Sequence, residues 1–440
     1  MATPARIVIV GGGYVGMYSA LRLQRKLRSS EAQVTVVDQQ SYMTYQPFLP
    51  EAAAGSLEPR HVVVPLRSVL RKCVVLTGSV TKIDHGQRCV TVQADTGPPR
   101  ELPYDHLVMA LGSVARTLPI PGLAEQAVGF KTVEEAIYLR NTVLSRLDLA
   151  ATTLDPAIRQ RALSFVFIGG GYAGIEAFAE LEDMAKGATR YYPGIAADDM
   201  RWVLVEATPR IMPEVSTALS AYTAERLTDR GMEVHLNTRL ESCVGGHVVL
   251  DDGTEFEADT IVWTAGVRAH PLIGSTDLPF DDKGRLVCTP ALEVKGAANV
   301  WSAGDNAAVP DLTRPGTLCA PSAQHAVRQA KRLGDNLVAA LRRKPLTDYR
   351  HKYAGSVASL GLHKGVAEIY GYRLRGYPAW VMHRTYHLSR VPTVNRKLRV
   401  SLDWFLSLFF RREIVSLGQL QNPREAFEQA TTASPKPRSS

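Results

Sequence analysis

Two glycine-rich hexapeptides combine residue types and spacing that suit the binding of a phosphate. The first is Gly-Gly-Gly-Tyr-Val-Gly at residues 11–16, and the second is Gly-Gly-Gly-Tyr-Ala-Gly at residues 169–174. In each, an apolar run leads into the glycines and a helix-compatible segment follows. The glycines allow a tight turn, a close approach of the backbone to a pyrophosphate and the packing of helix on strand, with the helix N-terminus facing the anion. The pair therefore predicts two dinucleotide sites in one chain.

Each hexapeptide is followed by a second apolar strand that ends in an acidic residue. The strand at 34–37 runs into Asp38, and the strand at 202–205 runs into Glu206. A carboxylate at this place accepts hydrogen bonds from ribose hydroxyl groups and repels a 2′-phosphate. Arg210, four residues after Glu206, is the one nearby feature that suits a 2′-phosphate. The acids favour dinucleotides without that group.

The composition is typical of a soluble globular protein with more than one domain. The 440 residues are 45% hydrophobic and 21% charged, with a mild net charge of +8. The five cysteines form no Cys-x-x-Cys pair, so we expect no metal site, disulfide framework or dithiol centre. The N-terminus leaves no room for a signal peptide, and no apolar run reaches the length of a membrane span. We expect a cytoplasmic protein with no nucleic-acid partner.

Three apolar strands end in small residues and a glycine, at 104–112, 258–266 and 299–304. The third has no glycine loop of its own, so it must complete a site begun elsewhere. We therefore expect an α/β fold with two nested Rossmann-like dinucleotide-binding domains and a C-terminal membrane-associating region. The expected bounds are 1–122 and 286–345 for the first domain, 123–285 for the nested domain, 346–424 for the C-terminal domain and 425–440 for a disordered tail.

The C-terminal region contains an apolar block at 402–410, about half the length that a membrane span requires. Basic residues flank the block, which predicts a helix lying in the membrane interface. The segment 378–388 has a similar character, and its histidines and arginine suit a headgroup boundary. The alternative is a helix buried in a core or in a homodimer interface. The flanking basic residues are Arg396, Lys397, Arg399, Arg411 and Arg412.

These features together resemble the two-dinucleotide flavoproteins of the pyridine nucleotide-disulfide oxidoreductase superfamily. Within it, the chain is most similar to the type II NADH:quinone oxidoreductases, over roughly residues 5 to 420. The resemblance implies that the first glycine loop holds FAD and that the segment 303–305 returns to the flavin side. It implies that the second loop holds NADH and releases NAD⁺.

The resemblance also assigns roles to individual residues. For FAD, it implies Gly11, Gly13, Gly16, Asp38, Val80, Ala110, Gly112, Gly304, Asp305, Ala323 and Gln324. For NADH, it implies Gly169, Gly171, Gly174, Glu206, Ala265 and Gly266.

Two polar residues are expected to act at the reacting groups. Glu176 follows the second glycine loop, where the resemblance places an acid close to the nicotinamide and the flavin, able to position NADH or pass a proton to quinone. Gln324 lies in a segment similar to the one that frames the flavin ring and the quinone pocket. The family pattern has a second glutamine at the position that Arg328 occupies in this chain. The glutamine here, Gln329, lies one residue further along. Alternatively, Glu176 only complements a helix N-terminus and Gln324 only caps backbone groups.

The predicted activity is FAD-dependent oxidation of NADH with two-electron reduction of a quinone, either menaquinone or ubiquinone. No proton channel is evident, so we expect a non-proton-pumping respiratory dehydrogenase, peripheral on the cytoplasmic face of the cell membrane. A homodimer is one of the assemblies that the sequence leaves open. One alternative is a sulfide:quinone oxidoreductase or a dithiol reductase, which needs a cysteine pair at the flavin; only Cys319 is near the expected segment. The other is a non-respiratory NADH-dependent flavoprotein that serves as a redox-sensing module.

Overall fold

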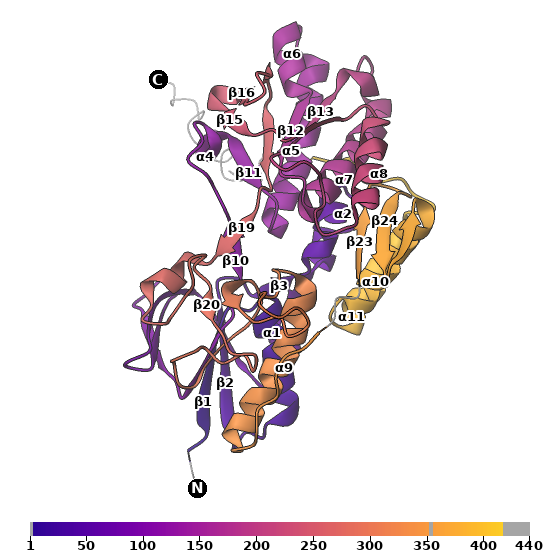
Figure 1. The fold of residues 1–440 in the computed structure, drawn as a ribbon. Helices are drawn as coiled ribbons and strands as arrows, with labels where there is room; N and C mark the ends of the chain where they lie inside the picture. Colours follow the sequence, from indigo (N-terminus) through magenta and orange to yellow (C-terminus); the bar gives the residue numbers. More distant parts are fainter. Residues whose placement is uncertain (1–2, 352–354, 417–440) are drawn as a thin grey trace, which may run out of the picture.

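The computed structural model describes residues 3–351 and 355–416 of the chain. Figure 1 shows two lobes, each built around a sheet, and a C-terminal region drawn in orange to yellow along one side. Two short antiparallel strands, β10 (Ser113–Ala115) and β19 (Val267–Ala269), pair where the chain crosses between the lobes. Among the described residues, no helix is both long enough and apolar enough to cross a membrane.

The first lobe contains a parallel sheet whose strands alternate with helices. The centre of this sheet is fully buried at Ile7 and Ile9. The helices α1 (Tyr14–Lys26) and α9 (Ala323–Leu341) pack side by side, although about 300 residues separate them. The sheet runs in the order β21 (Val300–Ser302), β9 (His106–Met109), β1 (Ala5–Val10), β2 (Ala32–Asp38) and β5 (Val74–Thr77). Because β21 comes from far along the chain, the second lobe is nested within the first, as predicted.

The second lobe repeats this arrangement. Its core contains an aromatic cluster in which the rings of Phe165 and Trp202 stack with centroids 4.4 Å apart. The parallel sheet runs in the order β11 (Ala127–Gly129), β18 (Thr260–Trp263), β12 (Ser164–Ile168), β13 (Arg201–Glu206) and β14 (Glu233–Leu236). The main helices of this lobe are α5 (Val133–Thr152), α7 (Tyr172–Ala188) and α8 (Thr217–Thr228).

Smaller elements complete both lobes. Each lobe carries a three-stranded antiparallel sheet, formed by β6 (Ser79–Asp84), β7 (Cys89–Gln93) and β8 (Arg100–Pro103) in the first and by β15 (Leu240–Ser242), β16 (His247–Leu250) and β17 (Glu255–Glu257) in the second. Two further strand pairs are β3 (Tyr42–Thr44) with β4 (Val63–Pro65) and β20 (Leu286–Val287) with β22 (Ala307–Ala308). The short helices are α2 (Leu49–Ala53), α3 (Leu66–Val69), α4 (Leu123–Gln126) and α6 (Pro156–Ala162).

The C-terminal region is a three-stranded antiparallel sheet followed by two helices. The strands are β23 (Gly355–Ser359), β24 (Gly365–Ile369) and β25 (Tyr372–Arg375), and the helices are α10 (Tyr377–Arg390) and α11 (Val394–Leu406). The first helix packs on β23 and β24, and β23 lies against α7 of the second lobe. The region therefore covers the side of the molecule where the two nucleotide-binding lobes meet (Figure 1).

The expected interfacial helix begins earlier than the apolar block at 402–410. It begins at Val394, because the Thr393 hydroxyl accepts a hydrogen bond from the amide of Arg396 (3.3 Å), and it ends at Leu406. Residues 407–410 follow in turns that are hydrogen-bonded to the last helical turn. The exposed apolar side chains of this segment are Val394, Leu398, Leu402, Phe405, Leu406, Leu408, Phe409 and Phe410. The predicted tail at 425–440 lies outside the described residues.

The headgroup role predicted for the segment 378–388 is wrong for its histidines and arginine. His383, Arg384 and His387 all pack inward. Arg384 donates a hydrogen bond to Glu51 (2.9 Å), and its guanidinium lies over the rings of Trp380 and Trp404. A charge that is paired and covered by aromatic rings can be buried, which a sequence pattern does not reveal.

Candidate active site

The first glycine loop is shaped by close backbone contacts. Gly11 has a φ of +103°, and a Cβ atom there would collide with the Ala110 carbonyl oxygen. A Cβ on Gly16 would collide with the Gly11 carbonyl oxygen, so α1 packs directly on the loop. By contrast, no heavy atom lies within 4 Å of the Cβ position of Gly13. The loop therefore has one open side, where a ligand can approach the backbone and the N-terminus of α1.

That open side faces a cavity of about 310 Å³. Eight residues that the resemblance assigns to FAD line this cavity, although they come from six separate stretches of the chain. They are Gly11, Gly13, Asp38, Val80, Ala110, Gly112, Asp305 and Ala323. The remaining three, Gly16, Gly304 and Gln324, are not among the lining residues. The cradle, the small residues and the carboxylates fit an adenine dinucleotide such as FAD.

The second glycine loop has the same construction. Gly169 has a φ of +112°, and a Cβ atom there would lie 2.7 Å from the Ala265 amide nitrogen. Gly174 packs against the Gly169 carbonyl, whereas the Cβ position of Gly171 is open. The Thr264 hydroxyl donates to the Gly169 carbonyl oxygen (2.9 Å), which ties the loop to the turn that contains Ala265 and Gly266.

The two acids at the strand ends are held in matching ways. Asp38 accepts hydrogen bonds from the amides of Gly12 (2.5 Å) and Gln40 (2.7 Å). Glu206 accepts hydrogen bonds from the amides of Gly170 (2.6 Å) and Thr208 (2.8 Å). Burial raises the pKa of Asp38, and the two amides oppose that shift. Each carboxylate is thus fixed at the mouth of its glycine loop.

Arg210 does not reach the position that a 2′-phosphate would require. Its guanidinium donates to the carbonyl oxygens of Val215 (2.8 Å) and Pro213 (2.6 Å). These bonds brace the loop that follows β13, so Glu206 is left as the charged group beside the second glycine loop.

A lysine that the sequence analysis missed lies in the first cavity. Lys131 follows β11 of the second lobe, and its ammonium group donates to the Ser113 hydroxyl (2.6 Å), which in turn donates to Asp305 (2.7 Å). Burial lowers the pKa of Lys131, while Asp305 and Glu135 oppose that shift. The nested lobe therefore supplies a cation to the cavity of the first lobe. A single lysine after a short strand carries no sequence signal for this role.

The start of α9 holds the two glutamines of interest in different surroundings. Gln324 donates from Nε2 to the Gly355 carbonyl oxygen (2.8 Å), and Arg328 donates to the Gln324 carbonyl oxygen (3.1 Å). Gln329 is buried, and its Oε1 atom accepts from the Gly304 amide (2.8 Å). Gln329 thus supports the loop at 303–305, whereas Gln324 binds the first residue of β23.

Glu176 is buried one turn into α7, against the C-terminal region. Its Oε1 atom accepts from the Ser359 amide (2.9 Å) and lies 3.1 Å from Nε2 of His383. Burial lowers the pKa of His383, but the hydrogen bond and charge of Glu176, with Glu51 and Glu180 behind it, raise the pKa above its usual value. The charge of Glu176 therefore favours the protonated form of His383.

A line of aromatic and imidazole side chains connects this pair to the first cavity. The rings of His383 and His387 lie 4.6 Å apart, and the Tyr45 hydroxyl is 3.1 Å from Nδ1 of His387. The Tyr45 ring is 6.2 Å from that of Tyr14, which lines the cavity. Burial and the charge of His383 lower the pKa of His387 well below its usual value, so this second imidazole is neutral.

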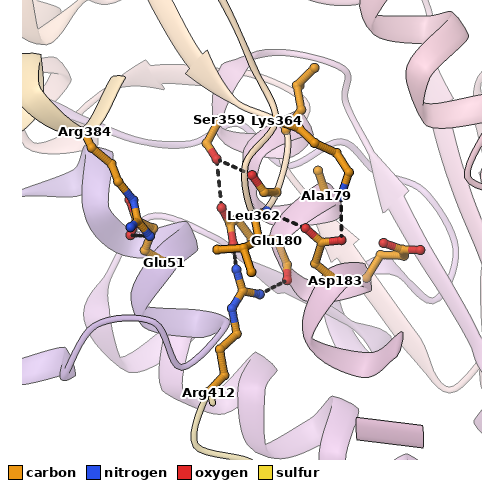
Figure 2. A network of polar contacts seen from close by, with 12 residues as sticks. Glu51, Ala179, Glu180, Asp183, Ser359, Leu362, Lys364, Arg384 and Arg412 are labelled. Atoms are coloured by element: carbon orange, nitrogen blue, oxygen red, sulfur yellow. Dashed lines mark hydrogen bonds and ion pairs between the residues drawn. The ribbon is translucent and has the colours of Figure 1, made fainter. Parts of the chain in front are cut away.

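Further acids on the same helix attach the C-terminal region. Figure 2 shows Glu180 and Asp183 on one helix, approached by side chains from the C-terminal region. Glu180 accepts from the Ser359 hydroxyl (2.8 Å) and from Arg412 (2.7 Å). Asp183 accepts from the Leu362 amide (2.5 Å). These bonds hold β23 against α7 and so fix the surroundings of Glu176.

The cysteines supply no dithiol in this part of the fold. All five lie within the described residues and are unpaired. Burial raises the pKa of the Cys319 thiol to about 11, so it is protonated near neutral pH. No group of three or more histidine, cysteine or acidic residues in the described ranges could hold a metal ion.

The geometry defines a class of protein with two dinucleotide sites, and comparison with known proteins agrees. Residues 5–330 match the family described as "Pyridine nucleotide-disulphide oxidoreductase". The chain is 30% identical to the type II NADH:quinone oxidoreductase Ndh of Mycobacterium tuberculosis, over 94% of this chain and 89% of that protein. It is 28% identical to a probable NADH dehydrogenase of Dictyostelium discoideum, over 93% and 91% of the two chains.

The solved structure of NDH2 from Plasmodium falciparum in complex with NADH has the same fold. The TM-score is 0.87 at 18% identity, over 93% of this chain and 99% of that chain. The chain belongs to the pyridine nucleotide-disulphide oxidoreductases and, within that family, to the type II NADH:quinone oxidoreductases.

Proposed function

We propose that this chain oxidises NADH through a bound FAD and passes the two electrons to a quinone. The observation that carries the proposal is the buried connection between the two nucleotide sites. Glu176 follows the second glycine loop, and the side chains of His383, His387 and Tyr45 lead from it toward the first cavity. This series of contacts joins the start of α7, beside the second glycine loop, to the lining of the first cavity through side chains of the C-terminal region.

The first cavity would hold FAD. The backbone around Gly11 and Gly13 would meet the pyrophosphate at the start of α1, and Asp38 would accept from the adenosine ribose. Lys131 and Asp305, which also line this cavity, would lie at the flavin side. When bound, FAD supplies the carrier that accepts two electrons from NADH and delivers them to quinone.

The second glycine loop would hold NADH. Gly169, Gly171 and Gly174 form the pyrophosphate cradle, and Glu206 would accept from the adenosine ribose. Because the Arg210 guanidinium is bound to its own loop, it does not compensate the charge of a 2′-phosphate at this carboxylate. This arrangement favours NADH over NADPH.

Glu176 and Gln324 would flank the quinone. Both bind the backbone of β23, Gln324 at Gly355 and Glu176 at Ser359. A quinone needs two protons when it is reduced, and the pair of Glu176 with protonated His383 holds a proton at this place. Arg328 stands beside Gln324, where the family pattern has a glutamine. We propose that Glu176 stabilises a proton on His383, that this pair donates the proton to the quinone, and that Gln324 orients the quinone headgroup.

The exposed apolar face of α11 would attach the protein to the cytoplasmic face of the cell membrane. The side chain of Phe405 in α11 is 55% exposed, and that of Phe409 in the turn after it is 69% exposed. Arg396, Lys397 and Arg399 lie on the same helix, whereas Arg412 binds the buried Glu180. Apolar side chains with cations beside them suit an interfacial helix, which would bring the quinone site to the lipid that contains quinone. A second copy of the chain is the competing occupant of this face, and sedimentation in detergent-free buffer tests for that homodimer.

The experiment is steady-state turnover of the FAD-loaded protein. NADH consumption should require a soluble menaquinone or ubiquinone analogue and should follow its concentration to saturation. Rapid NADH consumption that is independent of any quinone would refute quinone as the acceptor.

A further inference from the structure

A second cavity, of about 240 Å³, lies on α9 and shares no lining residue with the first cavity. Its charged lining consists of Arg328, Lys331, Arg332 and Asp335 from α9, with Arg350 and His351 from the segment that follows. Residues three and four apart lie on one face of a helix, so the α9 residues form a single charged stripe.

This cavity has a large excess of positive charge. Four cationic side chains face one carboxylate, that of Asp335. Asp335 is already bound from outside the lining, by Arg22 (2.7 Å) and by Lys26 (2.6 Å). Its negative charge is therefore satisfied without Lys331, Arg332 or Arg350.

The cations have few partners of their own. Within residues 3–351 and 355–416, the side chains of Arg332 and Arg350 form no hydrogen bond or ion pair. Burial lowers the pKa of Lys331, and Arg390, Arg22 and Arg328 lower it further. Like charges crowded together in this way cost free energy unless an anion joins them.

A histidine in the same lining also lacks a partner. The Nε2 atom of His351 is buried and has no hydrogen-bond partner among the described residues. Buried polar atoms are nearly always hydrogen-bonded, so an unpaired one beside four cations is an observation separate from the charge count.

We propose that this cavity binds a phosphate-bearing anion through Lys331, Arg332 and Arg350. Guanidinium groups bind phosphate oxygens through paired, charge-assisted hydrogen bonds, and Arg332 and Arg350 have no other partner among the described residues. The cavity is close to the end of α10, because the Tyr18 ring contacts Lys331 and the Tyr18 hydroxyl donates to the Arg390 carbonyl (3.4 Å). The exposed helix α11 begins four residues later, at Val394. The phosphate therefore has two possible sources, a soluble phosphate or the headgroup of an anionic lipid.

The test compares two double variants of the full-length, FAD-loaded protein. Arg332→Gln with Arg350→Gln removes two charges from the cavity. Arg343→Gln with Lys344→Gln removes two exposed charges just after α9 and serves as the control. Both variants should keep the visible flavin spectrum and the rate of NADH oxidation, which shows that they are folded. One arm titrates inorganic pyrophosphate by calorimetry, and the other measures flotation with phosphatidylcholine vesicles that contain or lack phosphatidylglycerol.

In at least one arm, the cavity variant should bind about tenfold or more weakly than the control. A difference with pyrophosphate supports the site with a soluble ligand. A difference only with phosphatidylglycerol vesicles supports the site with a lipid headgroup. Equal binding by the two variants in both arms would overturn the proposal.

Discussion

The Oε1 atom of Glu176 lies 3.1 Å from the Nε2 atom of His383, and both side chains are buried. Glu176 lies in α7, the helix that begins at the second glycine loop, and His383 lies in the C-terminal region, more than 200 residues later. This pair places a carboxylate and an imidazolium where the two nucleotide-binding lobes meet the C-terminal cover.

Replacing Glu176 should separate the two halves of the reaction. In Glu176→Gln, the side chain keeps its size but loses the charge that holds the proton on His383. Reduction of the flavin by NADH should change little, whereas reoxidation by quinone should slow on the order of 100-fold. Stopped-flow absorbance of the flavin measures both steps.

Glu180→Gln is the matched control for that variant. Glu180 is buried one turn further along α7 and binds Arg412, so its loss should cost about 3 kcal/mol of stability. Because Glu180 contributes less than Glu176 to the raised pKa of His383, its replacement should slow quinone reduction much less than Glu176→Gln does and should leave reduction by NADH near its normal rate. If Glu176→Gln and Glu180→Gln slow quinone reduction equally, a specific role for Glu176 is untenable.

The two histidines should give stability a dependence on pH with opposite signs. The raised pKa of His383 means that its ion pair stabilises the fold below the ordinary histidine pKa of about 6.5, and that this contribution is lost as pH rises through the folded value. The lowered pKa of His387 means that the fold is destabilised as pH falls below about 6.5, because the buried ring resists protonation.

Thermal unfolding between about pH 5 and 8 separates these effects in single variants. His383→Gln should remove the loss of stability at high pH, and His387→Gln should remove the loss at low pH. Identical pH profiles for the wild type and both variants would contradict the assigned charge states.

Glu206 should determine the choice of nucleotide. In Glu206→Ala, the repulsion of a 2′-phosphate is lost together with an acceptor for the ribose. The ratio of kcat/KM for NADH to that for NADPH should fall by about tenfold or more. The matched variant Asp38→Ala should lower FAD retention without changing this ratio. An unchanged ratio in Glu206→Ala would show that the ribose is recognised elsewhere.

Membrane attachment should depend on the exposed aromatic side chains of α11 and of the turn after it. Phe405→Ser with Phe409→Ser should weaken binding to vesicles by about tenfold per side chain, because each ring buries apolar area in lipid. Leu154→Ser with Tyr191→Ser removes exposed apolar groups elsewhere and is the control. Trp404 is unsuitable for this test because its indole donates to Glu51 (2.8 Å) and packs inward. Equal vesicle flotation of the two double variants would argue for a protein partner on this face.

The glycine loops and their acids were predictable because their chemistry is local. Gly11, Gly169, Asp38 and Glu206 each follow a strand within one βαβ unit, where spacing alone fixes their relation. The return of β21 to the first sheet was predictable for a similar reason, since a strand without a loop of its own needs a neighbour.

Other parts of the site could not be predicted from spacing. Lys131 belongs to one lobe and acts in the cavity of the other. His383 and His387 are four residues apart, a spacing that places two residues on one face of any helix, buried or exposed. Only their contacts with Glu176 and Tyr45 distinguish them from surface histidines. The start of α11 could have been predicted from Thr393, a residue type that often caps the N-terminus of a helix. The apolar block at 402–410 is the more conspicuous pattern, and it placed the expected helix too far along the chain.

The central claim is that electrons pass from NADH to quinone through FAD in the first cavity. Anaerobic stopped-flow with the FAD-loaded protein tests it most directly, by mixing with NADH or NADPH and then with a menaquinone or ubiquinone analogue. The account predicts rapid loss of the oxidised-flavin absorbance with NADH, a much slower loss with NADPH, and full recovery when quinone is added. Rapid bleaching by NADH with no recovery on addition of either quinone would contradict it.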